Sequence, residues 1–396
     1  MDSLIMENKV LQLDKSDWEL AKLGDLAKDI SERVENPGES EYDRFVGLGN
    51  FVSGDIKIKT WETTENLASS AKAFKSGDIL FARRNAYLRR ASLVDFDGCC
   101  SGDAFVLREK NEKVVPGFLA FLMNSNVLWD YANSNAAGTM SKRVKWRDLA
   151  KYEFLLPPKE QQAQLAKLLW AMDEVISNYL AVLSSINVLR KVYREKIISD
   201  EAYPTSLLEN VLDQIIAGKS LNGQNIPVTD NEKGVIKISS VGAGGFVPNE
   251  NKRLKSQEAF ISKYAVKKYD LLITRANTTE LVGRCCLVED DHPNLMLSDK
   301  TLKLVLKEKV DKVFIAEQLR ASHVRRQIES YATGTGGAMK NITQNEIKSI
   351  KIKMPDEKTQ VILGREIQVI KQNEKDLNLI IKSAKSLQKS LINQIF

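Results

Sequence analysis

Two short segments gather arginine and asparagine directly after an apolar run. The first, GDILFARRNAYLRRASLV, carries four arginines within eight residues, and the second, YDLLITRANTTELVGRCCLV, repeats the pattern more sparsely. Arginine can bind guanine edges through two hydrogen bonds, asparagine can bind adenine in the same way, and either can hold a phosphate. The candidate DNA-binding residues are Arg83, Arg84, Asn85, Arg89, Arg90, Arg275, Asn277 and Arg284.

Two other interpretations of these segments stay open. A run of arginines is often only a solvated basic face. Arg83 and Arg275 could also be structural, each pairing with a buried carboxylate such as Asp78 or Asp270. The position on a turn after an apolar strand, and its repetition in a second segment, favour DNA binding.

Two glycine–threonine loops form a second pair of candidate surfaces. Glycine lets backbone N–H groups approach a phosphate, and neighbouring cations neutralise it. An ordinary flexible loop is the alternative. The loop sequences differ, MSKRVKW against GGAMKNITQ, so two such readers should recognise unlike sequences. The candidates are Thr139, Ser141, Lys142, Arg143, Lys145, Thr335, Lys340 and Asn341.

No sequence motif could catalyse a reaction by itself. The chain has two histidines, and AGKS at 217–220 fails as a phosphate-binding loop because Asp213 stands where a glycine is required. The GAGG and GTGG turns lack the GxGxxG frame, and the Asn/Asp-Pro-Pro-aromatic motif of amino-methyltransferases is absent. Four cysteines form two adjacent pairs without CxxC spacing, so we expect free thiols, no metal site and a reducing compartment.

Composition describes an ordinary globular protein with a modest basic excess. The net charge is +6, which is compatible with a nucleic acid or an acidic protein as partner. The 396 residues allow two or three domains. The beginning of the sequence lacks the features of a signal peptide, and no run of eighteen apolar residues predicts a membrane span.

The chain is an internal duplication. Asp78, Arg83 and Asn85 align with Asp270, Arg275 and Asn277 at a constant offset. Further along, AAGT aligns with ATGT, and LLPPKEQQ aligns with IKMPDEKTQ. A period near half the chain indicates two copies of one domain-plus-helix unit, rather than a solenoid of short repeats.

A long helix with an apolar seam is expected after each of the two proline motifs, Pro157-Pro158 in LLPPKEQQ and Pro355 in IKMPDEKTQ. An apolar stripe of that length needs a partner, and the simplest partner is the other helix. We favour antiparallel pairing, because parallel pairing would crowd both globular units at one end. Asn373 also falls at a seam position and is a candidate for fixing register, or else an exposed residue. The predicted seam is Leu165, Leu168, Met172, Val175, Tyr179, Val182, Ile186, Leu189, Leu363, Ile370, Leu377, Ile380, Leu387 and Leu391.

The ordered set of motifs resembles the specificity (S) subunit of type I restriction–modification enzymes. The matching features are the LLPPKEQQAQLAKLLWAMDEVI helix start, the GDILFARRN and YDLLITRAN segments, and the AAGT and ATGT loops. The resemblance covers essentially the whole chain. In the second copy, one proline replaces two, and Tyr269 stands where the first has Gly77, which puts the turn before its strand in doubt.

The resemblance implies an α+β fold with two similar target recognition domains, separated and joined by two long helices that form an antiparallel coiled coil with pseudo-twofold symmetry. The domains would be residues 1–157 and 203–355, and the spacer helices 158–202 and 356–396. Each domain would read half of a bipartite site in double-stranded DNA. The helices would set the gap and dock the methyltransferase subunits.

The resemblance also implies that the chain is no enzyme and binds no cofactor. Two methyltransferase (M) subunits would carry S-adenosylmethionine, and restriction (R) subunits would use ATP and Mg²⁺. The complex would work in the cytoplasm of a bacterium or archaeon. The rival interpretation is a protein-interaction scaffold with two heads on a coiled-coil stalk, which leaves the paired Arg/Asn turns unexplained.

Overall fold

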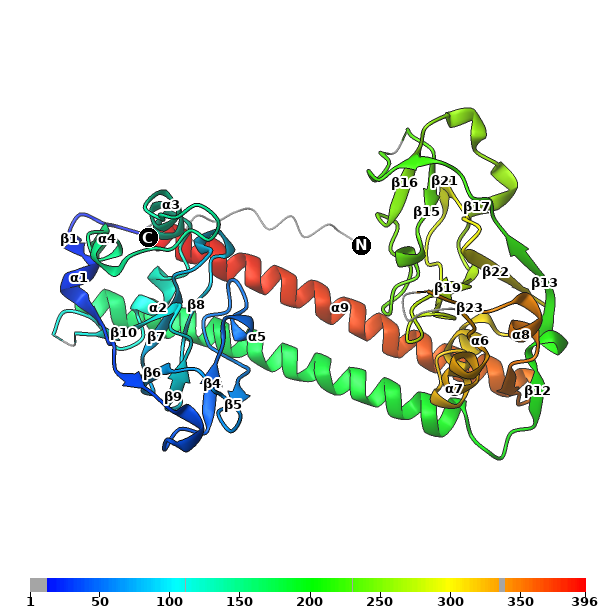
Figure 1. The fold of residues 1–396 in the computed structure, drawn as a ribbon, viewed down its shortest axis with the longest axis horizontal. Coiled ribbons are helices and arrows are strands. Elements are labelled where there is room, and N and C mark those ends of the chain that lie inside the picture. The colour runs from blue at the N-terminus through cyan, green and yellow to red at the C-terminus, as the bar shows by residue number, and fades with distance from the viewer. Residues whose placement is uncertain (1–12, 111, 230, 335–338) are drawn as a thin grey trace. The chain divides into compact units, whose positions relative to one another are not determined.

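The computed structural model describes residues 13–110, 112–229, 231–334 and 339–396. The chain divides into two compact units, one formed by the residues up to Ala181 together with Asn378–Phe396, the other by Val182–Leu377. Each unit contains a globular domain and a part of each of two long helices, α5 (Lys159–Tyr193) and α9 (Glu357–Ile395), drawn in green and red in Figure 1.

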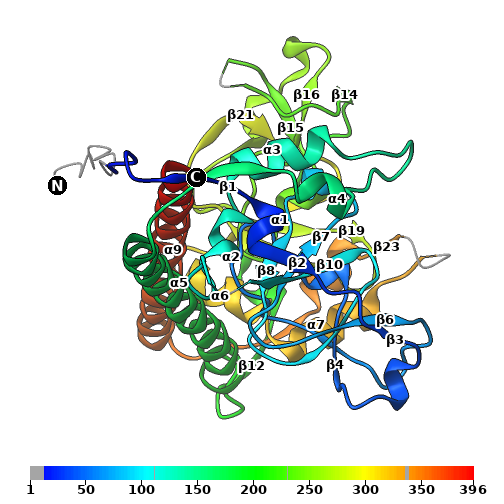
Figure 2. The same cartoon turned by 90° about the vertical axis from the view of Figure 1, so that its left-hand side faces the viewer.

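The first domain is built on two sheets. The smaller is antiparallel, with the order β2-β10-β7-β8, and the larger has the order β3-β6-β9-β4-β5. In β7, Ile79 and Phe81 enter one core and Leu80 the other, as alternation along a strand requires. Helix α2 lies against β8 (Figure 2). The bounds are β1 Glu19–Lys22, α1 Leu23–Leu26, β2 Ala27–Asp29, β3 Arg33–Val34, β4 Arg44–Val46, β5 Glu62–Thr63, β6 Ala71–Phe74, β7 Ile79–Ala82, β8 Ala91–Leu93, β9 Gly98–Cys100, β10 Ala104–Glu109, α2 Leu119–Leu122, α3 Asn126–Ser134, α4 Trp146–Leu149 and β11 Glu153–Leu156.

The second domain repeats this topology except at one edge of the larger sheet, where β14 pairs with β16, the counterpart of β5, whereas β3 of the first domain pairs with β6. Its sheets have the orders β13-β22-β18-β20 and β14-β16-β15-β21-β17, and β12-β24 repeats the β1-β11 pair of the first domain. The predicted duplication is therefore confirmed at the level of strand pairing. The bounds are β12 Thr205–Leu207, β13 Leu212–Ala217, β14 Gly223–Gln224, β15 Gly234–Ile236, β16 Asn251–Leu254, β17 Ala265–Val266, β18 Leu271–Thr274, β19 Ala276–Asn277, β20 Cys285–Leu287, β21 His292–Met296, β22 Thr301–Leu306, α6 Lys312–Gln318, α7 Ser322–Tyr331, β23 Lys340–Asn341, α8 Gln344–Lys348 and β24 Lys351–Lys353.

The turn before the central strand keeps its shape in both copies. Gly77 has a φ of 90°, and Tyr269 at the matching position has a φ of 65°. Both backbone N–H groups donate across the sheet, to Val94 O and Val288 O at 2.8 Å in each case. The tyrosine adopts a left-handed conformation that glycine adopts without strain. The glycine-to-tyrosine difference therefore leaves the turn intact.

A buried glutamine fixes each long helix to its domain. Gln162 Nε2 donates to Pro157 O at 2.8 Å, and Gln360 Nε2 donates to Pro355 O at 2.9 Å. The Oε1 atom of Gln162 accepts from Val115 N at 3.0 Å. The glutamine that follows the proline motif thus satisfies buried backbone groups where helix and domain meet.

The two long helices are antiparallel, as predicted. In the first unit, Leu391 and Ile392 near the end of α9 pack with Leu165 and Leu169 near the start of α5. In the second unit, Arg190 Nη1 near the end of α5 lies 3.1 Å from a carboxylate oxygen of Glu374, in the first half of α9. The pseudo-twofold relation between the two copies stays a prediction.

The predicted seam is correct at one heptad position and wrong at the other. Among the predicted residues, Leu165, Leu363, Leu377 and Leu391 are buried, and Met172, Tyr179, Ile186 and Ile370 are half-buried. The remaining six are 43–57% exposed, namely Leu168, Val175, Val182, Leu189, Ile380 and Leu387. In their place the next residue along is buried at Leu169, Ile176, Arg190, Ile381 and Gln388.

The shift of the seam has a packing cause. Each helix half contacts its globular domain as well as the other helix, since Leu165, Ala166 and Leu169 belong to the core of the first domain. A helix that faces a globular core buries a wide arc at i, i+3, i+4 and i+7 rather than a narrow two-residue seam. Of the two interpretations of Asn373, the structure agrees with an exposed residue and not with one that fixes register from within the seam.

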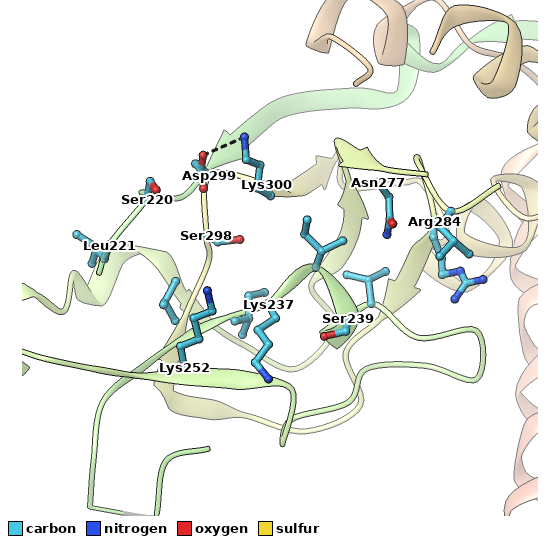
Figure 3. A pocket seen from close by; sticks show the side chains of 15 residues that line it. Ser220, Leu221, Lys237, Ser239, Lys252, Asn277, Arg284, Ser298, Asp299 and Lys300 are labelled. Carbon is cyan, nitrogen blue, oxygen red and sulfur yellow. Dashed lines mark ion pairs between the residues drawn. The ribbon is translucent and has the colours of Figure 1, made fainter. Parts of the chain in front are cut away.

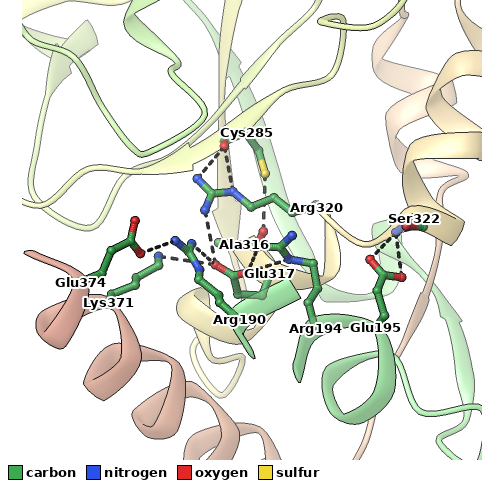
Figure 4. Close-up of polar contacts among 10 residues, drawn as sticks. All are labelled: Arg190, Arg194, Glu195, Cys285, Ala316, Glu317, Arg320, Ser322, Lys371 and Glu374. Carbon is green, nitrogen blue, oxygen red and sulfur yellow. Dashed lines mark hydrogen bonds and ion pairs between the residues drawn. The ribbon is translucent and has the colours of Figure 1, made fainter. Parts of the chain in front are cut away.

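A buried ion cluster joins α5, α6 and α9 in the second unit (Figure 4). Glu317 of α6 is fully buried, and its carboxylate lies 2.7 Å from Arg190, near the end of α5, and 2.8 Å from Arg194, which directly follows α5. Arg320 at 3.3 Å and Lys371 at 3.7 Å complete the cluster. Burial raises the pKa of the Glu317 carboxyl, but these four cations outweigh it and lower that pKa to about 2.

Candidate nucleic-acid interface

In the first domain, the arginine turn and the glycine–threonine loop come together at the end of β7. Arg83 N donates to Asp103 O at 3.0 Å, and Val144 N donates to Arg83 O at 2.9 Å. Asn85 N donates to Lys142 O at 2.9 Å. Two segments that the sequence proposed separately therefore form one surface, and residues 83–85 lie between the β10 entry and the loop.

Asp103 lies at the centre of the cationic side chains of this surface. Its carboxylate is 2.8 Å from Arg143 Nε, 3.5 Å from Arg84 Nη1 and 3.8 Å from Arg83 Nε. The hydrogen bond from Arg143 lowers the pKa of Asp103 below its usual value, and the carboxyl therefore stays ionised. Sequence reasoning missed this residue, since an aspartate after SG in a strand entry carries no motif.

Other candidates in the first domain divide into engaged and exposed side chains. Arg89 donates to Asn126 Oδ1 and to Asp130 Oδ1, each at 2.8 Å, which ties it to α3. Arg90 Nη1 donates to Leu48 O at 2.8 Å, and burial lowers the pKa of Arg90. Both hold the turn within the domain. The exposed candidates are Thr139, Lys142 and Lys145, and Ser141 is half-buried.

Asp78 and Asp270, named as examples in the structural alternative, are not the partners of Arg83 and Arg275, although Arg83 Nε does lie 3.8 Å from another carboxylate, that of Asp103. Asp78 is instead held by Arg108, through two contacts of 2.7 Å. Asp270 lies 3.3 Å from Lys303 Nζ. These aspartates also accept backbone N–H groups three residues earlier, so they stabilise the turn before the strand.

The second domain builds the same junction at the end of β18. Arg275 N donates to Lys300 O, and Ile342 N donates to Arg275 O, both at 2.9 Å. Strands β19 and β23 pair so that Asn277 lies opposite Lys340, and Ala276 lies opposite Asn341. Candidate residue Thr335 lies outside the described residues.

A pocket of about 580 Å³ adjoins this junction (Figure 3). Of the predicted residues, Asn277 and Arg284 line it. Lys237, Lys252 and Lys300 line it as well, and among the described residues that line it Asp299 is the only one with a carboxylate. A concave, positively charged surface of this kind suits a phosphate backbone and the acceptor atoms of base edges.

The arginines of the second domain differ from those of the first in their partners. Within the described residues, neither the Arg275 nor the Arg284 side chain has a hydrogen-bond or ion-pair partner. Lys300 Nζ lies 3.5 Å from Asp299. Lys237 Nζ likewise lies 3.4 Å from Glu250, so within the described residues Arg275 and Arg284 differ from these two lysines in having no carboxylate partner. The three pocket lysines were missed because they lie outside both the arginine turns and the glycine–threonine loops.

The geometry is that of a duplicated basic surface, and comparison with known proteins gives its family. The type I restriction modification DNA specificity domain matches residues 15–182 and again residues 215–391. The chain belongs to this family of specificity subunits. A specificity subunit determines the DNA sequence on which a type I restriction–modification complex acts and is its non-catalytic component.

The specificity subunit is similar to relatives over most of its length. It is 25% identical to the Escherichia coli K12 type I restriction enzyme EcoKI specificity subunit over 319 residues, which cover 75% of this chain and 68% of that protein. The crystal structure of the S subunit from M. genitalium superposes with a TM-score of 0.60 at 15% identity, over 99% of this chain and 98% of that one.

A second solved structure concerns complex assembly and conformational transition of the type I R-M system. It matches the specificity subunit with a TM-score of 0.56 at 20% identity, over 96% of this chain and 97% of that one. At these identities the two structures support the fold. In the described part of the specificity subunit, no helix is long and apolar enough to cross a membrane.

Proposed function

We propose that each recognition domain reads one half of a bipartite DNA target through the junction between its central strand and its glycine–threonine loop. The observation that carries the proposal is the repetition of that junction. Arg83 and Arg275 hold equivalent backbone positions, and each lies beside loop residues that differ between the copies. Two domains with equivalent backbone positions but different loop side chains are suited to binding two half-sites of different sequence.

The surface of the long helices supports the proposed docking of the methyltransferase subunits. In the first unit, Leu168 and Val175 are 43% and 47% exposed. In the second unit, Val182, Leu189 and Val369 are 50–60% exposed. Apolar side chains repeated along an exposed helix face favour a protein partner. The partners would supply S-adenosylmethionine, and restriction subunits would supply ATP and Mg²⁺ chemistry.

The four buried free thiols support the proposed cytoplasmic location. Cys99, Cys100, Cys285 and Cys286 form no disulfide. Thiols persist in a reducing compartment, which is also where cellular DNA would be met.

Replacing Arg275 and Asn277 with alanine is expected to weaken recognition of one half-site and to spare the other. Each lost base contact should reduce discrimination by about 1–3 kcal/mol. The measurement is sequencing of adenine methylation in cells that express the chain with its methyltransferase. Lys309→Ala, an exposed change after β22, is the control. Equal loss at both half-sites would contradict two independent readers, and absence of any split motif with the unaltered chain would contradict the proposed function.

Lengthening both helices is expected to widen the gap between half-sites without changing either half. One heptad added to α5 and one to the facing part of α9 adds about 10 Å at 1.5 Å per residue, or about three base pairs at roughly 3.4 Å each. The same methylation map gives the result. An unchanged gap would show that the helices do not set it.

A further inference from the structure

The two recognition surfaces carry opposite charges at structurally equivalent positions. Asp103 directly precedes β10 and accepts the N–H of Arg83, while Lys300 directly precedes β22 and accepts the N–H of Arg275. The strand registers agree, because Ala104 pairs with Ala82, and Thr301 pairs with Thr274. An acid in the first domain is therefore a lysine in the second.

A second position shows the same exchange. Glu62 of β5 pairs with Phe45 of β4, and Lys252 of β16 pairs with Val235 of β15. Strands β4 and β15 are equivalent, since each runs parallel to its neighbour, β9 or β21. Glu62 and Lys252 are both exposed, and Lys252 lines the pocket of the second domain.

The side chains around the exchanged position differ as well, because Arg84 and Arg143 pair in the first domain where Ala276 and Asn341 pair in the second, and only Arg83 has an arginine counterpart, Arg275. Asp103 holds three guanidinium groups, and its bidentate contact with Arg143 fixes the direction of that side chain. Lys300 can hold none. A guanidinium oriented by a carboxylate presents its remaining donors in a defined direction, whereas unpaired cations attract any phosphate.

We propose that the two domains divide their work: the second supplies most of the sequence-independent attraction for DNA, and the first discriminates more sharply because Asp103 positions its arginines. This inference rests on the proposed function. It makes Asp103 a positioning residue and Lys300 a direct phosphate or base ligand. The two residues should therefore act in opposite directions when their charges are removed.

The test compares Asp103→Asn with Lys300→Gln in the full chain assembled with its methyltransferase. Binding to an unrelated duplex is measured over a range of salt concentrations. Asp103→Asn should steepen the dependence of log affinity on log salt and tighten non-specific binding. Lys300→Gln should lower the slope by about 1 and weaken non-specific binding. Asp95→Asn and Lys309→Gln are the matched exposed controls.

Specificity provides the second measurement. Asp103→Asn should relax methylation at the half-site of the first domain alone. Lys300→Asp, which recreates the first domain's charge in the second, should lower non-specific affinity and sharpen the other half-site, so the proposal can be tested even if Asp103→Asn folds poorly. Slopes that shift in the same direction, or only as the controls do, overturn the inference. If the unaltered complex methylates no specific split motif, the proposed function itself is overturned instead.

Discussion

Replacing Glu317 with glutamine is expected to destabilise the second unit by about 3–5 kcal/mol, because it leaves buried cations without their counter-ion. The carboxylate has no exposed surface, and Arg190 is 8% exposed. Glutamine keeps the volume but supplies one neutral acceptor where two charged oxygens now accept from Arg190 and Arg194. The largest loss of local stability is therefore expected where the second half of α5 packs against α6.

The measurement is hydrogen–deuterium exchange of the full chain, followed by peptide. Exchange should rise in α6, the second half of α5 and the first half of α9, and it should stay unchanged in the first domain. Glu374→Gln is the matched control, since Glu374 contacts Arg190 at 3.1 Å but is partly exposed, and a loss below about 1 kcal/mol is expected there. Equal protection of Glu317→Gln and the unaltered chain would show that the cluster does not hold the joint.

The Glu317 carboxylate should make the fold less stable as the pH falls through the acidic range. The usual pKa of the Glu317 carboxyl is 4.5, and in the folded chain it is about 2. A lowered carboxyl pKa stabilises the fold at pH values above the unfolded-state pKa, and that contribution is lost as pH falls from about 4.5 through about 2. Glu317→Gln should remove this part of the acid sensitivity.

The first unit shows why this joint could not be predicted from one copy. Glu317 lies three residues after Phe314, and Phe121 lies three residues after Phe118. Phe121 packs against Trp170 of α5 with ring centroids 4.7 Å apart. The same joint is therefore aromatic in one copy and ionic in the other. Comparing the copies residue by residue would have found both this exchange and that of Asp103 for Lys300.

The duplication, the strand runs and the long helices followed from the sequence because they depend on local pattern. Apolar runs such as ILFA and LLIT form central strands, and a long helix follows each of the two proline motifs, at Pro157-Pro158 and at Pro355. The exposed heptad positions were not predictable from spacing, because a periodic pattern does not say how many surfaces a helix faces. The role of Asp103 was not predictable either, because it depends on Arg84 and Arg143, which lie 19 and 40 residues away in the sequence.

The affinity of the assembled complex for its target DNA is expected to fall about 10³–10⁵-fold as salt rises from about 50 to about 200 mM, if six to ten phosphates are contacted. The reason is counter-ion release, to which each neutralised phosphate contributes a slope of about 0.9. The described surface of the second domain offers Lys237, Lys252, Lys300 and Arg284 around one pocket. Arg275, Lys340 and the exposed Lys142 and Lys145 of the first domain could add further contacts.

A fluorescence anisotropy titration of labelled duplex at several salt concentrations gives this slope. A duplex with both half-sites scrambled is the control, and it should show a comparable slope with a weaker affinity, because phosphate contacts are independent of sequence while base contacts are not. A flat response would contradict the phosphate contacts assigned to these basic surfaces. A steep slope with equal affinity for both duplexes would instead show that the surfaces hold DNA without reading it, and the two half-site variants would then be expected to change nothing.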